Sequence, residues 1–294
     1  MAENNALDKS AKIGFIGLGW MGSNFAKRLV EGGWSLEVFD IDAGRVDALD
    51  GAEGANCAEE IVGNCQVVLT SLPNSDVFEA VVRDQLIPNA RREQLFVDLG
   101  TSRLEPTRGF AREMGERGAS LLDAPVSGDP RQPVYMFVGG ERDAFERVRP
   151  VLETIADPAH LTLGGESGAG QVLKAVNQLA MGLVQAAWLE TLSFATCQGV
   201  DADRVGEAVG GEGGWRRTLR EVAGRIAAGE AEGMDLKFAE LPYFLDAAKQ
   251  AEMDLPLTEA LYEYCKPGPR NWRDNMNRPY VSFWHMLERG GCSG

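Results

Sequence analysis

The sequence carries a glycine-rich turn of the kind that holds a phosphate group. Gly17 suits a tight turn, Gly19 lets the backbone approach a pyrophosphate, and Gly22 lets the following helix pack closely on the preceding strand. The start of that helix adds N–H groups and the positive end of a helix dipole. The turn Gly17-Leu18-Gly19-Trp20-Met21-Gly22 therefore predicts a dinucleotide-binding site.

An acidic residue, Asp40, ends the second apolar run and bears on the choice of dinucleotide. A carboxylate at this place accepts hydrogen bonds from a ribose 2′-hydroxyl and repels a 2′-phosphate. Ile41 and Asp42 bring no positive charge, and Arg45, the nearest basic residue, is also interpretable as a solvated helix residue. The pattern favours NAD over NADP.

A lysine is the other candidate for chemistry. Lys174 is the only basic residue in the apolar stretch 168–197. Burial lowers the pKa of a lysine toward the range useful for proton transfer. Asn177 and Gln178, three and four positions on, share its side of a helix. The alternative is a lysine that extends out of the helix's first turns into solvent, and the residues alone leave both interpretations open.

Short apolar runs separated by helical patterns must position these groups. The runs are Lys12–Ile16, Leu36–Phe39, Gln66–Ser71, Leu95–Leu99, Ser120–Asp123 and Tyr135–Gly139. Such alternation is typical of βαβ units. We therefore expect an α/β fold, a Rossmann-type doubly wound, mostly parallel sheet with helices on both faces.

After Gly165 the alternation of apolar runs and helical patterns gives way to helical patterns alone. The stretch Gly168–Cys197 predicts one long helix, apolar on nearly all sides, which suits an axis shared between domains or between subunits. Further helical patterns cover Arg216–Ala228, Leu236–Ala251, Leu257–Tyr264 and Ser282–Glu288. We predict a dinucleotide-binding domain over residues 1–165 and an all-helical C-terminal domain over residues 166–294, joined by the long helix.

Composition excludes several classes of function. The 294 residues include 29 Lys and Arg against 44 Asp and Glu, a net charge of −15, which argues against nucleic acid as a partner. A polar N-terminus and the lack of a long apolar run argue against export and against a membrane span. Five dispersed cysteines, an odd number without a CxxC pair, fit free thiols in the cytoplasm. The two histidines, His160 in an expected loop and His285 near the C-terminus, lack metal-ligand spacing, so we predict no metal.

Five motifs in order along the chain resemble those of the β-hydroxyacid dehydrogenases, the family of 3-hydroxyisobutyrate, tartronate semialdehyde and 6-phosphogluconate dehydrogenases. They are Gly17–Gly22, Leu72-Pro73, Asp98-Leu-Gly-Thr101, Asp123-Ala-Pro-Val-Ser-Gly128 and Gly168-Ala-Gly-Gln-Val-Leu-Lys174-Ala-Val-Asn177. The resemblance spans nearly the whole chain.

The resemblance implies a mechanism and a site. Lys174 would exchange the proton of the substrate hydroxyl during hydride transfer at the adjacent carbon. Ser127 and Gly128 would bind the substrate carboxylate, with Asn177 positioning it and Gln178 standing where the family commonly has a second asparagine. Leu72, Pro73 and Thr101 would line the nicotinamide cofactor. Family members are usually dimers or tetramers built around the long helix, so we expect a homo-oligomer and a small carboxylate substrate.

The departures from the family pattern keep alternatives open. The loop Asp129–Pro133 is short and stiff, and its Arg131 is either a surface residue or an anion clamp. Glu240 stands where the family has a lysine, and Pro242 predicts a kink in the helix there. An imine reductase, or a dinucleotide-binding protein with altered catalysis, are the alternatives to a hydroxyacid dehydrogenase.

Overall fold

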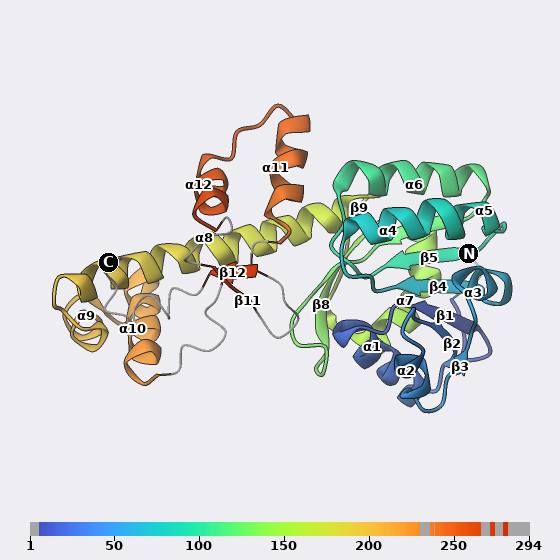
Figure 1. Ribbon diagram of the computed structural model, residues 1–294, viewed down its shortest axis with the longest axis horizontal. Coiled ribbons are helices and arrows are strands. Elements are labelled where there is room, and N and C mark those ends of the chain that lie inside the picture. Colours follow the sequence, from blue (N-terminus) through green and yellow to red (C-terminus); the bar gives the residue numbers. More distant parts are fainter. Residues whose placement is uncertain (1–5, 230–235, 238, 266–270, 274–278, 282–294) are drawn as a thin grey trace. The chain divides into compact units, whose positions relative to one another are not determined.

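The computed structural model (Figure 1) describes residues 6–229, 236–237, 239–265, 271–273 and 279–281 of the 294. By packing, the chain divides into two units, Met1–Val176 and Asn177–Gly294. The proposed domain boundary after residue 165 stays a prediction.

The first unit is built on a nine-stranded sheet in the order β3-β2-β1-β4-β5-β6-β8-β7, with β9 pairing with β8. Strands β1 to β6 pair in parallel, β8 runs antiparallel to β6 and β7, and β9 is parallel to β8. The strands are β1 (Lys12–Ile16), β2 (Ser35–Phe39), β3 (Glu53–Gly54), β4 (Val67–Thr70), β5 (Leu95–Asp98), β6 (Ser120–Asp123), β7 (Val126–Ser127), β8 (Val134–Gly139) and β9 (Ala156–Gly165). The mostly parallel doubly wound sheet is confirmed.

Helices cover both faces of this sheet because its central strands are apolar on both sides. Alternate residues such as Phe15, Leu69 and Val97 share one core with α1 and α7, whereas Val68 and Phe96 share the opposite core with α3, α4 and α6. These helices and their connections are α1 (Trp20–Glu31), α2 (Ala43–Asp47), α3 (Ala58–Asn64), α4 (Ser75–Val81), the π-helical turn η1 (Val82–Leu86), α5 (Ile87–Asn89), α6 (Leu104–Glu116) and α7 (Arg142–Ile155).

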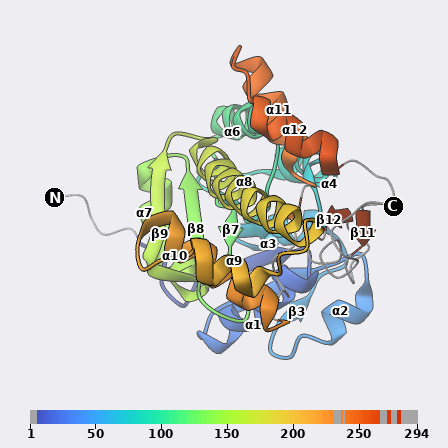
Figure 2. The same ribbon diagram turned by 90° about the vertical axis from the view of Figure 1, so that its left-hand side faces the viewer.

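Strand β9 was not expected from the sequence. His160, predicted to lie in a loop, lies in this strand, where its ring stacks on Tyr135 with centroids 3.9 Å apart. Figure 2 shows β8 and β9 side by side. Most residues of β9 are half-buried or exposed, so the sequence lacks the apolar run that predicts a strand.

The long helix is confirmed as α8 (Ala169–Cys197), which begins in the first unit and continues into the second. The other helices of the second unit are α9 (Ala202–Val209), α10 (Gly214–Ala227), α11 (Leu241–Gln250) and α12 (Pro256–Cys265). Three short strands, β10 (Leu236–Lys237), β11 (Asn271–Arg273) and β12 (Pro279–Val281), form a small sheet that the all-helical expectation did not include.

The helix predicted over Leu236–Ala251 is shorter in the structure, and the predicted kink is wrong. Leu236 and Lys237 belong to β10, and α11 begins at Leu241. Pro242 lies in the first turn of α11, where a proline fits because no intrahelical N–H is needed there. The helix predicted over 282–288 and His285 lie outside the described residues.

Candidate active site

The predicted cofactor residues come together at one edge of the sheet. Parallel strands place their carboxyl ends at the same edge, and β2, β1, β4 and β5 are neighbours in that order. The glycine turn follows β1, Asp40 follows β2, Leu72-Pro73 follows β4 and Thr101 follows β5. Strand order reverses between β1 and β4, the place where open α/β sheets bind their ligands.

The glycine turn is packed against its neighbours in the manner the sequence predicts. Gly17 has a φ of +95°, and a Cβ there would lie 2.4 Å from the Ser71 carbonyl oxygen. A Cβ at Gly22 would lie 2.0 Å from the Gly17 carbonyl oxygen, so helix α1 packs on the turn only with glycine. A Cβ at Gly19 would meet no protein atom within 4 Å, which leaves the approach to its backbone open.

The non-glycine residues of the turn divide between core and surface. Leu18 is buried in the core, Met21 packs against it, and Trp20 is exposed. Leu72 lies against the turn, its Cδ2 being 3.2 Å from a Cβ built at Gly17, whereas Pro73 is exposed. Leu72 thus lies beside the glycine turn at the carboxyl end of β4.

Asp40 holds the backbone of the glycine turn. Its Oδ2 accepts a hydrogen bond from the Leu18 N–H at 2.6 Å, and its Oδ1 accepts one from the Asp42 N–H at 2.9 Å. The Arg45 guanidinium lies 3.5 Å from Asp40 and 3.4 Å from Asp42 and is half exposed. A carboxylate has about four acceptor positions, so Asp40 retains capacity for a ribose hydroxyl.

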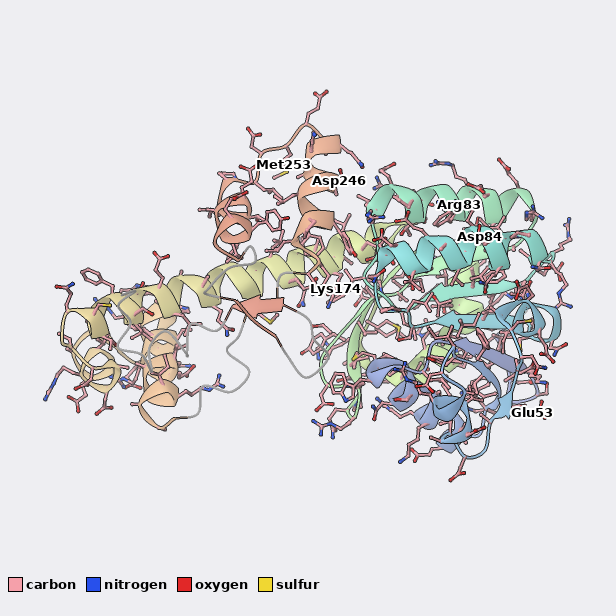
Figure 3. All side chains as sticks on the ribbon, viewed as in Figure 1. Glu53, Arg83, Asp84, Lys174, Asp246 and Met253 are labelled. Atoms are coloured by element: carbon pink, nitrogen blue, oxygen red, sulfur yellow. The ribbon has the colours of Figure 1, made fainter. Side chains whose placement is uncertain are left out.

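Lys174 is buried, with only 7% of its surface exposed, so the interpretation as a lysine that reaches out to solvent is wrong. Figure 3 shows it on α8. Its Nζ donates a hydrogen bond to the Val126 carbonyl oxygen at 2.7 Å. The next residue is Ser127, the predicted carboxylate ligand, followed by Gly128 with a φ of +127°. The structure thus brings the lysine amine to the substrate loop named by the sequence.

Asn177 and Gln178 follow Lys174 on α8 by three and four positions, which places them on its side of the helix. The Gln178 Oε1 is buried and has no hydrogen-bond partner among the described residues. A buried acceptor without a partner is costly, and a donor on a ligand would relieve that cost.

Two buried carboxylates underlie the site, and each begins one of the motifs that resemble those of the family. Asp98 and Asp123 end the adjacent strands β5 and β6, in register with each other. Burial raises the pKa of Asp98 to about 6, against hydrogen bonds from Ser102, Gly100 and Thr70 that lower it. Burial also raises the pKa of Asp123. The motifs mark these two positions, but the sequence does not show that both carboxylates are buried at the ends of adjacent strands.

Asp123 fixes the start of α8. Its Oδ1 accepts a hydrogen bond from the Gly168 N–H at 2.7 Å, and its Oδ2 accepts one from the Gln171 N–H at 2.9 Å. A carboxylate satisfies the free N–H groups of a helix start and interacts favourably with the helix dipole. The helix that carries Lys174 is therefore anchored to the sheet one turn before the lysine.

The short loop after Gly128 pairs its own charges. Arg131 Nε donates to both carboxylate oxygens of Asp129 at 2.9 and 3.0 Å, and both side chains are exposed. The Arg131 guanidinium holds the pKa of Asp129 at about 2. Arg28 donates to the Gln132 carbonyl oxygen at 2.7 Å and ties the loop to α1. This geometry supports the interpretation of Arg131 as a surface residue.

Glu240 and the predictions on metals and membranes concern other parts of the chain. Glu240 directly precedes α11 and is partly buried. Among the residues that the structure describes, no three His, Cys, Asp or Glu side chains lie close enough to hold a metal ion. In the same part of the chain, no helix is long and apolar enough to cross a membrane.

Comparison with known proteins identifies the family. A family model described as the NAD binding domain of 6-phosphogluconate dehydrogenase matches residues 12–165, and one described as the NAD-binding of NADP-dependent 3-hydroxyisobutyrate dehydrogenase matches residues 168–274. The 2-(hydroxymethyl)glutarate dehydrogenase of Eubacterium barkeri is 30% identical over 98% of this chain and 99% of its own. The 2-hydroxy-3-oxopropionate reductase of Escherichia coli is 31% identical over 86% of this chain and 89% of its own.

A solved structure shares the fold over nearly the whole chain. It is that of the Mycobacterium tuberculosis 3-hydroxyisobutyrate dehydrogenase with L-serine, with a TM-score of 0.77 and 24% identity over 95% of this chain and 98% of that one. The chain belongs to the β-hydroxyacid dehydrogenase family, whose members are NAD(P)-dependent dehydrogenases and reductases of hydroxy acids.

Proposed function

We propose that the protein interconverts a small 3-hydroxy acid and its semialdehyde, with Lys174 as the group that exchanges the hydroxyl proton. The observation that carries the proposal is the burial of Lys174 with its amine 2.7 Å from the Val126 carbonyl, beside Ser127. The relatives' names support the substrate class, since 2-(hydroxymethyl)glutarate and 2-hydroxy-3-oxopropionate both carry a carboxylate and, two carbons away, a primary alcohol or an aldehyde.

The chain's own groups divide the work of this reaction. The Ser127 hydroxyl and the Gly128 N–H bind the substrate carboxylate, and Asn177 and Gln178 orient the substrate. In oxidation the Lys174 amine takes the hydroxyl proton, and in reduction its ammonium returns a proton to the carbonyl oxygen. The glycine turn, Leu72, Pro73 and Thr101 would hold a nicotinamide dinucleotide, which would supply or accept the hydride.

For the cofactor we propose NAD rather than NADP. Asp40 is a carboxylate at the end of β2, and it is held in place by the Leu18 N–H of the glycine turn. A 2′-phosphate placed beside it meets like charge, whereas a ribose 2′-hydroxyl finds an acceptor. Arg45 forms ion pairs with Asp40 and Asp42. Because these carboxylates already neutralise its charge, Arg45 is a poor partner for a 2′-phosphate.

We further propose that a second copy of this chain covers α8. Several large apolar side chains of this helix are more than half exposed: Val176, Met181, Val184 and Phe194. Apolar exposure of this extent on one helix is typical of an interface. Light scattering on the purified protein tests this directly, and a monomeric mass would contradict it.

The experiment for the activity is a substrate panel with both cofactors. Small semialdehydes should consume NADH, and the matching 3-hydroxy acids should reduce NAD. Reduction of cyclic imines instead would identify an imine reductase. Binding of NADH without turnover of either class would indicate a dinucleotide-binding protein without catalysis.

A further inference from the structure

Gln171 joins three segments of the first unit. It lies in the first turn of α8 and is only 4% exposed. Its Oε1 accepts a hydrogen bond from the Ser102 N–H at 3.0 Å, and its Nε2 donates one to the Gly100 carbonyl oxygen at 3.0 Å. Its own backbone N–H donates to Asp123 at 2.9 Å. One residue thus connects the loop after β5, the end of β6 and the start of α8.

Asp98 fixes the conformation of the loop after β5, to which Gln171 is hydrogen-bonded. Asp98 accepts a hydrogen bond from the Gly100 N–H at 3.0 Å through Oδ1 and from the Ser102 hydroxyl at 2.7 Å through Oδ2. Ser102 is 5% exposed and Asp98 is fully buried. Asp98 thus holds the loop on the sheet side, and the two hydrogen bonds of the Gln171 side-chain amide tie the loop to α8.

The hydrogen bonds of Gln171 to this loop lie one helical turn from Lys174. Lys174 follows Gln171 by three residues, about 4.5 Å along the helix axis. Thr101, the predicted neighbour of the nicotinamide, lies between the two backbone groups that Gln171 contacts. A change at Gln171 therefore alters the distance between the cofactor loop and the amine without touching either the cofactor or the substrate.

The chemistry of the contact requires a glutamine. One bond needs an acceptor and the other a donor, and a side-chain amide offers both on one flat group. A glutamate would place a second acceptor against the Gly100 carbonyl, and a methionine of similar length supplies neither bond. An asparagine is one methylene too short to reach both groups.

We propose that Gln171 is a positioning residue that sets the distance between the Asp98–Thr101 loop and the Lys174 amine. This role rests on the proposed function of Lys174. If Gln171 has this role, loss of its side-chain amide slows hydride transfer and leaves the affinities for NADH and for the aldehyde largely unchanged.

The test is Gln171→Met, measured beside Gln94→Met as a matched control. Gln94 is also buried at 2% exposure; its Nε2 donates to the carbonyl oxygens of Val62 at 2.7 Å and Cys65 at 2.8 Å, and its Oε1 accepts from the Arg91 N–H at 2.9 Å. It directly precedes β5, at the strand end opposite the site. Both variants lose a buried side-chain amide, but only Gln171→Met loses the hydrogen bonds between the loop after β5 and α8.

The readouts are kcat per NADH-binding site, KM for the aldehyde, Kd for NADH, and the isotope effect on kcat with NADH deuterated at C4. For Gln171→Met we expect kcat to fall about tenfold to a hundredfold, KM and Kd to change little, and the isotope effect to rise because hydride transfer becomes rate-limiting. Gln171→Glu should not rescue the rate.

Gln94→Met should lower the melting temperature and leave kcat per binding site and the isotope effect as in the wild type. A Gln171→Met variant that behaves in the same way would overturn the positioning role and leave the proposed function standing. A wild type inactive on every semialdehyde would refute the proposed function, and the positioning role with it.

Discussion

Gly170→Ala should displace the helix that carries Lys174. A Cβ at this position would lie 2.4 Å from the Phe137 carbonyl oxygen, 2.6 Å from the Asp123 carbonyl oxygen and 2.8 Å from the Asp123 Oδ2. Two of these three atoms are backbone atoms of adjacent strands in the sheet, so they cannot turn away as a flexible side chain would. The start of α8 must move instead.

The size of the movement follows from these distances. Ordinary contact begins at 3.4 Å, so the deficit at Phe137 is 3.4 − 2.4 = 1.0 Å. A shift of that size directed along the line between the Lys174 Nζ and the Val126 carbonyl oxygen lengthens their 2.7 Å separation to at most 3.7 Å, beyond hydrogen-bond range. Overpacking of this kind costs about 1–3 kcal/mol of stability, and a misplacement of about 1 Å at a catalytic group costs up to about a hundredfold in rate.

The assay compares thermal unfolding and kcat of Gly170→Ala with those of Gly109→Ala. Gly109 lies inside α6, and the nearest atom to a Cβ there is the Arg112 Nη2 at 4.0 Å. The control should gain up to about 1 kcal/mol from the better helix propensity of alanine and keep full activity. A Gly170→Ala variant with the melting temperature and kcat of the wild type would refute the close packing of α8 on the sheet.

Three further variants test other parts of the account. Asp40→Asn keeps an acceptor for the Leu18 N–H but loses the charge, and we expect about a tenfold loss of NADH affinity relative to NADPH in fluorescence titrations; an unchanged ratio would contradict the role of the carboxylate. The pKa of Asp98 lies at about 6 rather than 3.8, so the folded protein keeps a proton that the unfolded chain has lost, and its contribution to stability falls as pH rises through about 4 to 6. The unfolding free energy of the wild type minus that of Asp98→Asn should therefore drop by about 3 kcal/mol across that window, and a flat difference in urea titrations would count against the raised pKa. Lys12→Met removes the ammonium that lies 2.5 Å from the buried carboxylate of Glu37 and leaves that carboxylate with the hydrogen bond from the Asn64 amide. The change should cost about 3 kcal/mol in chemical denaturation, and a loss near zero would show that the ion pair contributes little to stability.

Much of the fold is predictable because its central strands are short apolar runs buried on both faces. Runs such as Lys12–Ile16 and Leu95–Leu99 correspond to β1 and β5, and the glycine turn follows its strand as expected. The weak elements were missed. β3 and β7 have two residues each, and β9 contains a proline and a histidine and is mostly half-buried or exposed.

Lys174 was recognisable because it is the only basic residue in a mostly apolar helix, and its match to the lysine of the family motif favoured a role in proton transfer. Its contact, the Val126 carbonyl, was not predictable, since it depends on where α8 meets the sheet. The same limit applies to the network of Asp98, Asp123 and Gln171. These residues are far apart in the sequence, and only the pairing of β5 with β6 and the anchoring of α8 bring them together.

Lys174→Met tests whether the Lys174 amine exchanges the substrate proton. Methionine keeps the length and burial of the side chain and removes the amine, so the variant should fold, bind NADH with the wild-type Kd, and lose semialdehyde reduction almost entirely. Measured with the best substrate of the panel, a kcat near that of the wild type would show that another group exchanges the proton and that the role assigned to Lys174 is wrong.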